Sequence, residues 1–243
     1  MTEPLVILSG VVGSRAYGTF TVDSDTDVKG IAVPPIENVL GMRGWEGVHG
    51  STAANNTRSG PGDVDTVIYE LRKWAHLAAK GNPNILELLW LPEYQVRLNA
   101  GQWLIDNRQL FVSKDAGRAC LGYMRSQVQA LNGMRNKRTN RPELVHKHGY
   151  DTKYAYEAIK IGFEGVDLMT NHGIYLPGSP QEIESLMEIR NGKLSKEEFL
   201  KYAEYIEDML KTRIKESPIR EHPARDEIDA LLIDIQQGVW SDT

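Results

Sequence analysis

The stretch LVILSGVVGSRAYGTFTVDSDTDVKGIAV, residues 5–33, carries the pattern from which the fold is predicted. Residues 5–12 are apolar and rich in β-branched side chains, and residues 25–33 return to that composition, so both are predicted to be strands. Gly13 and Ser14 follow the first strand, where a glycine lets the main chain approach a phosphate closely. The main-chain amides at this turn and the Ser14 hydroxyl are therefore candidate phosphate donors.

Two aspartates stand at the start of the second predicted strand. Asp25 and Asp27 are one residue apart, and side chains at i and i+2 of a strand share a face, so both carboxylates can hold a hard cation. A third predicted strand, residues 63–69, offers Asp65 as the best-placed third ligand, with Asp63 as the alternative on the same face. Such a site can hold two metal ions, which serve the attacking and leaving oxygens of an in-line displacement. A solvated strand end is the competing interpretation.

The rest of the pattern divides the chain into an α/β half and a helical half. Residues 41–62 are rich in Gly, Ser, Asn and Thr, which bury little surface, so we expect a loop that is poorly ordered without substrate. Helices are predicted over 71–81, ending at a capping Gly81, and over 83–89. Beyond residue 104 strand signals nearly vanish, and helical periodicity covers residues 124–131, 153–163, 183–189 and 199–209. The predicted domains are residues 1–100 and 101–243.

Composition and charge restrict the class of protein. The 243 residues are 41% hydrophobic, and the single cysteine, Cys120, cannot form an internal disulfide, which suits a reducing cytoplasm. The apolar run near the start is shorter than a membrane span and follows an acidic residue, so we expect no membrane anchor and no signal peptide. The net charge of -5 gives no global attraction to nucleic acid, so a polyanion must contact a local basic segment.

Residues 134–153 form such a segment. Its basic residues outnumber Glu143 and Asp151 and comprise Arg135, Lys137, Arg138, Arg141, Lys147 and Lys153. Lys147, Tyr150 and Lys153 combine cationic and aromatic side chains at helix-like spacing, which suits triphosphate pairing and base stacking. A solvated basic helix is the alternative.

Two charged residues elsewhere have open assignments. Arg15 either contacts a triphosphate or pairs with the nearby aspartates. Glu87 lies in an apolar run, and a buried carboxylate needs a partner, so we expect a salt bridge to an arginine.

These residues resemble a known family. GSRAYG at 13–18, DSDTD at 23–27 and DTVIYELRK at 65–73 are similar to predicted nucleotidyltransferases linked to RNA repair, within the DNA polymerase β superfamily. The likeness continues through GNPNILELL at 81–89, HKHGYDTKYAY at 146–156 and IRNGKLS at 189–195, so it covers most of the chain. Glu70 stands where some relatives have aspartate, which leaves open whether it contacts metal.

The resemblance implies an α+β fold, with a palm-like sheet followed by a helical subdomain that completes a cleft for nucleotide and acceptor. It implies Mg²⁺, as two ions and with Mn²⁺ as an alternative, at a catalytic and metal-binding site formed by Asp25, Asp27 and Asp65. The implied nucleotide contacts come from Gly13, Ser14, Arg15, Lys147, Tyr150 and Lys153.

The implied reaction transfers a nucleoside monophosphate from an NTP to an acceptor hydroxyl and releases pyrophosphate. Because one fold serves many acceptors, the fold alone does not choose between them. An RNA 3′ end is the leading acceptor. The alternatives are nucleotidylation of a protein or a small molecule, and a non-catalytic module that binds NTP or RNA.

Overall fold

Two units make up the chain in the computed structural model, which describes residues 3–54, 59–132 and 141–242. The first unit comprises Met1–Lys80, Asn84–Phe111 and Pro223–Thr243, and the second comprises Gly81–Pro83 and Val112–His222. This division differs from the predicted boundary at residue 100, because the last helix of the chain groups with the sheet. Arg135, Lys137 and Arg138 lie outside the described residues.

A mixed sheet forms the base of the first unit. Within the described residues its strands are β1 (Leu5–Val11), β2 (Thr26–Val33), β3 (Gly47–Ser51), β4 (Val64–Glu70) and β5 (Val96–Arg97). Their order across the sheet is β3-β4-β2-β1-β5, with β2 and β4 parallel and every other neighbouring pair antiparallel. The three strands predicted from apolar runs are β1, β2 and β4. β1 and β2 form because their apolar residues are buried against the helices, as Leu8 and Ile31 show by being fully inaccessible, whereas the apolar residues of β4 are only partly buried.

Part of the segment 41–62 was wrongly predicted to be a loop. β3 pairs antiparallel with β4, from Gly47 opposite Tyr69 to Ser51 opposite Asp65. Most of its side chains are exposed, so this edge strand lacks the alternating apolar residues from which a strand is predicted. Hydrogen bonds to β4, which composition does not reveal, stabilise it. Residues 55–58 lie outside the described residues.

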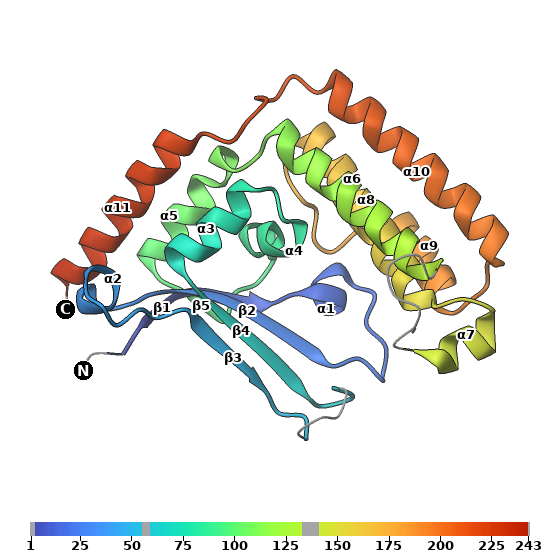
Figure 1. Ribbon diagram of the computed structural model, residues 1–243, viewed down its shortest axis with the longest axis horizontal. Coiled ribbons are helices and arrows are strands. Elements are labelled where there is room, and N and C mark those ends of the chain that lie inside the picture. Colours follow the sequence, from blue (N-terminus) through green and yellow to red (C-terminus); the bar gives the residue numbers. More distant parts are fainter. Residues whose placement is uncertain (1–2, 55–58, 133–140, 243) are drawn as a thin grey trace. The chain divides into compact units, whose positions relative to one another are not determined.

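Helices cover one face of the sheet (Figure 1). They are α3 (Leu71–Ala79), α4 (Pro83–Leu86) with the 3₁₀ helix η1 (Glu87–Trp90), α5 (Asn99–Asp106), η2 (Arg108–Leu110) and α11 (Arg225–Ser241). Two short helices, α1 (Gly13–Tyr17) and α2 (Ile36–Leu40), flank β2 in the chain. The core includes Trp74 of α3, which is fully buried and meets Phe111 edge to face at 5.3 Å between ring centroids.

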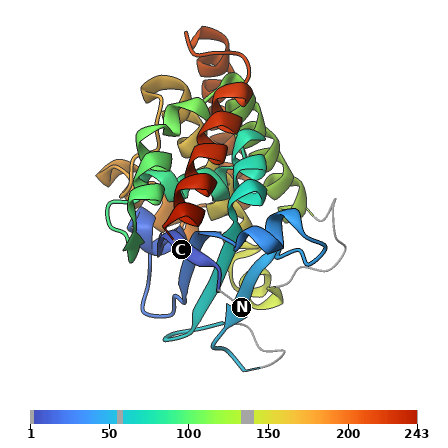
Figure 2. The same cartoon turned by 90° about the vertical axis from the view of Figure 1, so that its left-hand side faces the viewer.

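The C-terminal helix returns to the sheet unit, as Figure 2 shows for α11 beside α3 and α5. Its apolar face buries Ile228, Leu232 and Ile235. Near its end, the Trp240 indole donates a hydrogen bond of 2.9 Å to the carbonyl oxygen of Pro34, just beyond β2. These long-range contacts are the reason that α11 belongs with residues more than a hundred positions earlier.

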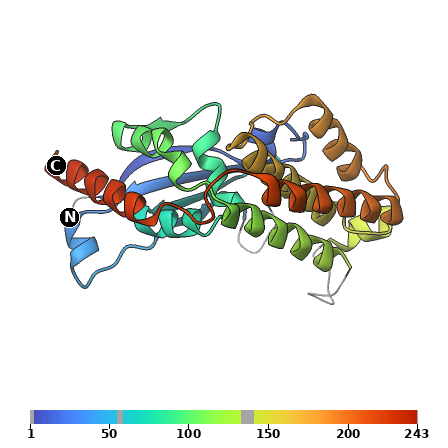
Figure 3. The same ribbon diagram turned by 90° about the horizontal axis from the view of Figure 1, so that it is seen from above.

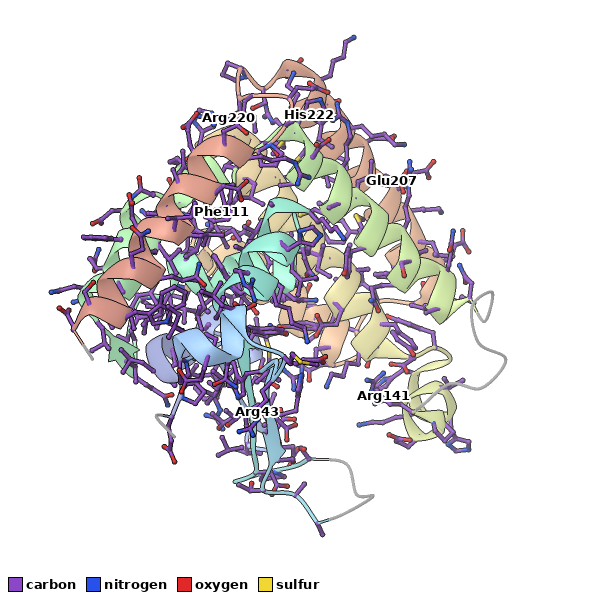
Figure 4. All side chains as sticks on the ribbon, turned by 60° about the vertical axis from the view of Figure 1, so that its left-hand side comes forward. Arg43, Phe111, Arg141, Glu207, Arg220 and His222 are labelled. Atoms are coloured by element: carbon purple, nitrogen blue, oxygen red, sulfur yellow. The ribbon has the colours of Figure 1, made fainter. Side chains whose placement is uncertain are left out.

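The second unit is helical. It contains α6 (Lys114–Leu131), α7 (Pro142–His148), α8 (Thr152–Asn171), α9 (Pro180–Arg190) and α10 (Lys196–Glu216), of which α6, α8 and α10 lie side by side (Figure 3). Gly165 of α8 permits close packing, since an added Cβ would lie 2.8 Å from the Cβ of Cys120. Arg220 and His222, labelled in Figure 4, lie in the segment after α10. A hydrogen bond from the Lys114 amide to the Arg220 carbonyl oxygen fixes this segment to the start of α6.

Side chains cap the first turns of α8, α9 and α10. Asp151 accepts hydrogen bonds from the Lys153 and Tyr154 amides at the start of α8, and Ser179 and Ser195 open α9 and α10 with capping boxes. Across the described part of the chain, no helix combines the length and apolar character needed to cross a bilayer.

Candidate metal and nucleotide site

Three carboxylates converge at one end of β2 and β4. Oxygens of Asp25, Asp27 and Asp65 lie within 4.8 Å of one another in the described residues, and all three residues are partly buried. The sheet register accounts for this convergence, because Asp27 and Asp65 are paired residues on the parallel strands β2 and β4. Asp25 precedes β2 by one residue. Three oxygen ligands of this kind suit a hard cation such as Mg²⁺.

The loop before Asp25 is held in place by Arg15. The guanidinium of Arg15 donates to the carbonyl oxygen of Asp25 at 3.0 Å and to that of Ser24 at 3.1 Å. The Ser24 hydroxyl in turn accepts a bond of 2.9 Å from the Thr21 amide. Arg15 therefore binds main-chain oxygens. The sequence had suggested either a contact with a triphosphate or an ion pair with the aspartate carboxylates. Arg15 positions a metal-ligand candidate through the loop.

Gly13 brings the main chain against the cluster. Its φ of +67° lies in the left-handed region, and an added Cβ would be 3.0 Å from Oδ2 of Asp27. The amide of Val12 also donates to the carbonyl oxygen of Asp27 at 2.9 Å. Gly13 begins α1, so the amides of Gly13 and Ser14 are in the first turn of that helix, next to the aspartates.

The structure separates Asp65 from the two other acids considered for the site. Ser59 donates to Oδ1 of Asp65 at 2.9 Å, and the carboxylate remains within the cluster. Asp63 instead accepts from the Gly60 amide at 2.9 Å and thereby fixes the turn before β4. Glu70 accepts from the Lys73 amide at 2.8 Å and caps α3 at the far end of the strand. Neither Asp63 nor Glu70 belongs to the cluster.

Glu87 pairs with a lysine, so the expectation of an arginine partner was wrong. Lys29 Nζ lies 2.7 Å from Oε1 of Glu87 and 2.5 Å from the carbonyl oxygen of Asn84, and Glu87 is 1% exposed. Lys29 follows Asp27 by two residues on β2 and therefore shares its face. The pair fixes the strand that carries Asp27 to η1. Alternation of Asp25, Asp27 and Lys29 was a signal in the sequence for this role.

The basic segment separates into buried and exposed members. Tyr150 is buried, its hydroxyl donates to the Leu194 carbonyl oxygen at 2.9 Å, and its ring stacks on Phe199 at 5.9 Å. This packing does not support a base-stacking role for Tyr150. Arg141 Nη1 lies 3.1 Å from the carboxylate of Asp151, the residue that caps α8.

Lys147 and Lys153 keep the exposure that a nucleotide contact requires. Lys147 is exposed on α7, and Lys153 is exposed in the first turn of α8. Both belong to the second unit.

The parallel β2–β4 pair with its aspartates, together with the glycine that leads from β1 into α1, is the arrangement that the resemblance to the DNA polymerase β superfamily implies. The chain belongs to the RNA repair pathway DNA polymerase beta family (RlaP), whose model matches residues 3–234. This finding confirms the resemblance and the α+β fold class.

A relative and a solved structure extend the comparison. The chain is 31% identical over 126 residues to an uncharacterized 38.9 kDa protein from the nrdC-mobD intergenic region of Enterobacteria phage T4, a match covering 50% of this chain and 37% of that protein. A nucleotidyltransferase-like protein from Exiguobacterium sibiricum matches 88% of this chain and 69% of its own, at 10% identity and a TM-score of 0.32.

Proposed function

We propose that the protein transfers a nucleoside monophosphate from an NTP to an acceptor hydroxyl and releases pyrophosphate. The observation that carries this proposal is the convergence of Asp25, Asp27 and Asp65 within 4.8 Å, beside the glycine turn. Membership in the RNA repair family supports an RNA 3′ end as the acceptor.

The chemistry of the cluster fits divalent metal. Asp25, Asp27 and Asp65 would hold Mg²⁺, as two ions, through carboxylate oxygens. When bound, the metal would neutralise phosphate charge and favour ionisation of the attacking hydroxyl. In the transfer the acceptor hydroxyl gives its proton to solvent water and its oxygen bonds to the α-phosphorus. The bond between that phosphorus and the oxygen bridging to the β-phosphate breaks, so pyrophosphate leaves with the electron pair.

The protein's own groups orient the nucleotide. We assign phosphate contacts to the Gly13 and Ser14 amides and to the Ser14 hydroxyl, which donate hydrogen bonds to anionic oxygens. Lys153, with Lys147 as the second candidate, is the cation assigned to the triphosphate. Arg15 stabilises the loop that presents Asp25, so its contribution is to position that ligand.

Pyrophosphate release with Mg²⁺ and each NTP, with and without bulk RNA, tests the proposal. Release stimulated by RNA is the expected result. Release that is indifferent to RNA would favour a protein or small-molecule acceptor. If the wild-type protein released no more pyrophosphate than Asp25→Asn, and both stayed at background with every NTP, the transfer reaction would be excluded. That result would favour a non-catalytic module.

A further inference from the structure

The loop between α1 and Asp25 displays two large apolar side chains to solvent. Phe20 is 52% exposed and Val22 is 90% exposed. The loop is nevertheless well fixed, since the Thr19 amide donates to the Ser14 carbonyl oxygen at 2.8 Å and the Ser24 amide donates to that of Thr21 at 3.0 Å. Exposure of Phe20 and Val22 is thus a property of an ordered loop, and a ligand that covered them would gain apolar burial.

Arg15 connects this apolar tip to the aspartate cluster. Its guanidinium carbon lies 5.3 Å from the centroid of the Phe20 ring, and its Nε is 3.0 Å from the carbonyl oxygen of Asp25. One side chain therefore touches both the aromatic ring and the residue that presents a candidate metal ligand. Arg15 lies over one face of the Phe20 ring, so a group stacked on the other face would lie near the loop that carries Asp25.

Arg15 also borders a hollow of about 270 Å³. Val11, Ala16, Pro92 and Tyr94 supply much of its wall, and the exposed Glu93 and Gln95 add an acceptor and an amide. Sites that enclose a whole drug-sized ligand measure roughly 300–1,000 Å³, so this slightly smaller hollow has room for a planar ring. Arg15 relates the hollow to the loop that carries Asp25, because its guanidinium also donates to the Asp25 carbonyl oxygen.

We propose that Phe20, Val22 and the hollow beside Arg15 bind the bases of a single-stranded nucleic-acid acceptor, with Phe20 stacked on one base. The inference rests on the proposed function and names the acceptor class. A planar base has an apolar face for Phe20 and an edge for Glu93 and Gln95. Duplex bases are already stacked and cannot reach such a surface without unpairing. The apolar tip and the hollow are two distinct surfaces that both border Arg15, and two surfaces suit successive bases of a strand better than a mononucleotide.

Binding of a labelled single strand tests this surface without requiring turnover. The probes are fluorescein-labelled oligoadenylate and oligouridylate of about ten nucleotides, measured by anisotropy without NTP. Phe20→Ala should weaken binding about tenfold, or ~1.4 kcal/mol, whereas Phe20→Trp should retain it. Trp103→Ala is the matched control, because Trp103 is a similarly exposed aromatic residue (48%) on α5 of the same unit. It should bind as wild type.

Three results would overturn the inference: no binding of either strand by the wild type at low salt, wild-type affinity in Phe20→Ala, or an equal loss in Trp103→Ala. A parallel assay of pyrophosphate release keeps the two proposals separate. If Asp25→Asn released pyrophosphate normally while Phe20→Ala lost strand binding, the metal-dependent transfer would fail and the binding surface would stand. If the wild-type protein released pyrophosphate in response to RNA while Phe20→Ala bound the strand as well as the wild type does, the transfer reaction would stand and the binding surface would fail.

Discussion

Asp27 on β2 and Asp65 on β4 are paired residues of two adjacent parallel strands, although α2 and β3 separate them in the chain. Paired residues on neighbouring strands project side chains to the same face, so this register places their carboxylates together. A shift of β4 by one residue would turn Asp65 to the opposite face. The site therefore depends on the β2–β4 register as much as on the presence of the acids.

Asp27→Asn should abolish Mg²⁺-supported pyrophosphate release and leave the melting temperature nearly unchanged. The change removes charge needed to hold the cation without opening a cavity. We expect a loss of at least about a hundredfold, or ~2.7 kcal/mol of barrier. Asp63→Asn is the matched control, because it removes the same charge only two residues from Asp65. The Asp63 carboxylate accepts from the Gly60 amide and is not part of the cluster. Turnover of Asp27→Asn within about tenfold of wild type would contradict the metal assignment.

Gly13→Ala should raise the Mg²⁺ concentration needed for turnover, because the added Cβ would crowd Oδ2 of Asp27 at 3.0 Å. Backbone strain at φ +67° should also lower the free energy of unfolding by about 1–2 kcal/mol. Gly62→Ala has a similar φ of +84° with open space around the new Cβ, so it should share the strain and keep the Mg²⁺ dependence. Mg²⁺ titrations and urea unfolding measure the two effects. Identical titrations for both variants would refute the crowding.

Lys29→Met should destabilise the first unit by about 3 kcal/mol, because it removes the ammonium from a carboxylate that is 1% exposed. The double variant Lys29→Met with Glu87→Leu should recover most of the loss, since no buried charge remains. Urea unfolding of the single and double variants measures the coupling energy. Additive losses would show that the ion pair contributes nothing as a pair.

Lys153→Ala should raise the NTP concentration required and lower turnover, if the ammonium contact strengthens as charge develops on the leaving pyrophosphate. Lys153→Arg should restore part of the activity, with imperfect geometry. Thermal stability should barely change, because Lys153 is exposed. Tyr150→Phe provides the contrast: it loses the hydrogen bond to Leu194 and about 1 kcal/mol of stability, and keeps normal nucleotide use. Wild-type kinetics in Lys153→Ala would leave Lys147 as the next candidate.

Asp167→Asn should stabilise the second unit near neutral pH. Burial, and then the charge of Glu182, raise the pKa of Asp167 from 3.8 to about 6. Between these values the folded state binds more protons than the unfolded state, so the unfolding free energy falls as pH rises and the penalty is complete above the folded pKa. Allowing for partial solvent exposure, the gain should be about 1 kcal/mol at about pH 7.5 and clearly smaller at about pH 4.5. Denaturant unfolding at both pH values checks the sign; an equal gain at both would contradict it.

Local periodicity in the sequence was enough to predict β1, β2 and β4 and at least part of α3, α4, α6, α8, α9 and α10, whereas α5, α7 and α11 were not predicted. Strands repeat every two residues and helices about every 3.6, so apolar spacing records these elements directly. The same periodicity placed Asp25 and Asp27 on one face, and the glycine turn before them completed the pattern of the family. Gly81 was likewise predicted as a capping residue, and it adopts φ +73° just after α3.

The remaining features depend on contacts between residues far apart in the chain. The β2–β4 register brings Asp65 into the cluster, whereas Asp63 fixes a turn. The exposed residues of β3 form a strand because they pair with β4. The Trp240 contact returns α11 to the sheet, and packing on Phe199 buries Tyr150. Local periodicity does not encode these pairings and contacts. Each depends on the free energy of a contact with a distant residue, and the neighbouring residues in the chain do not specify that partner.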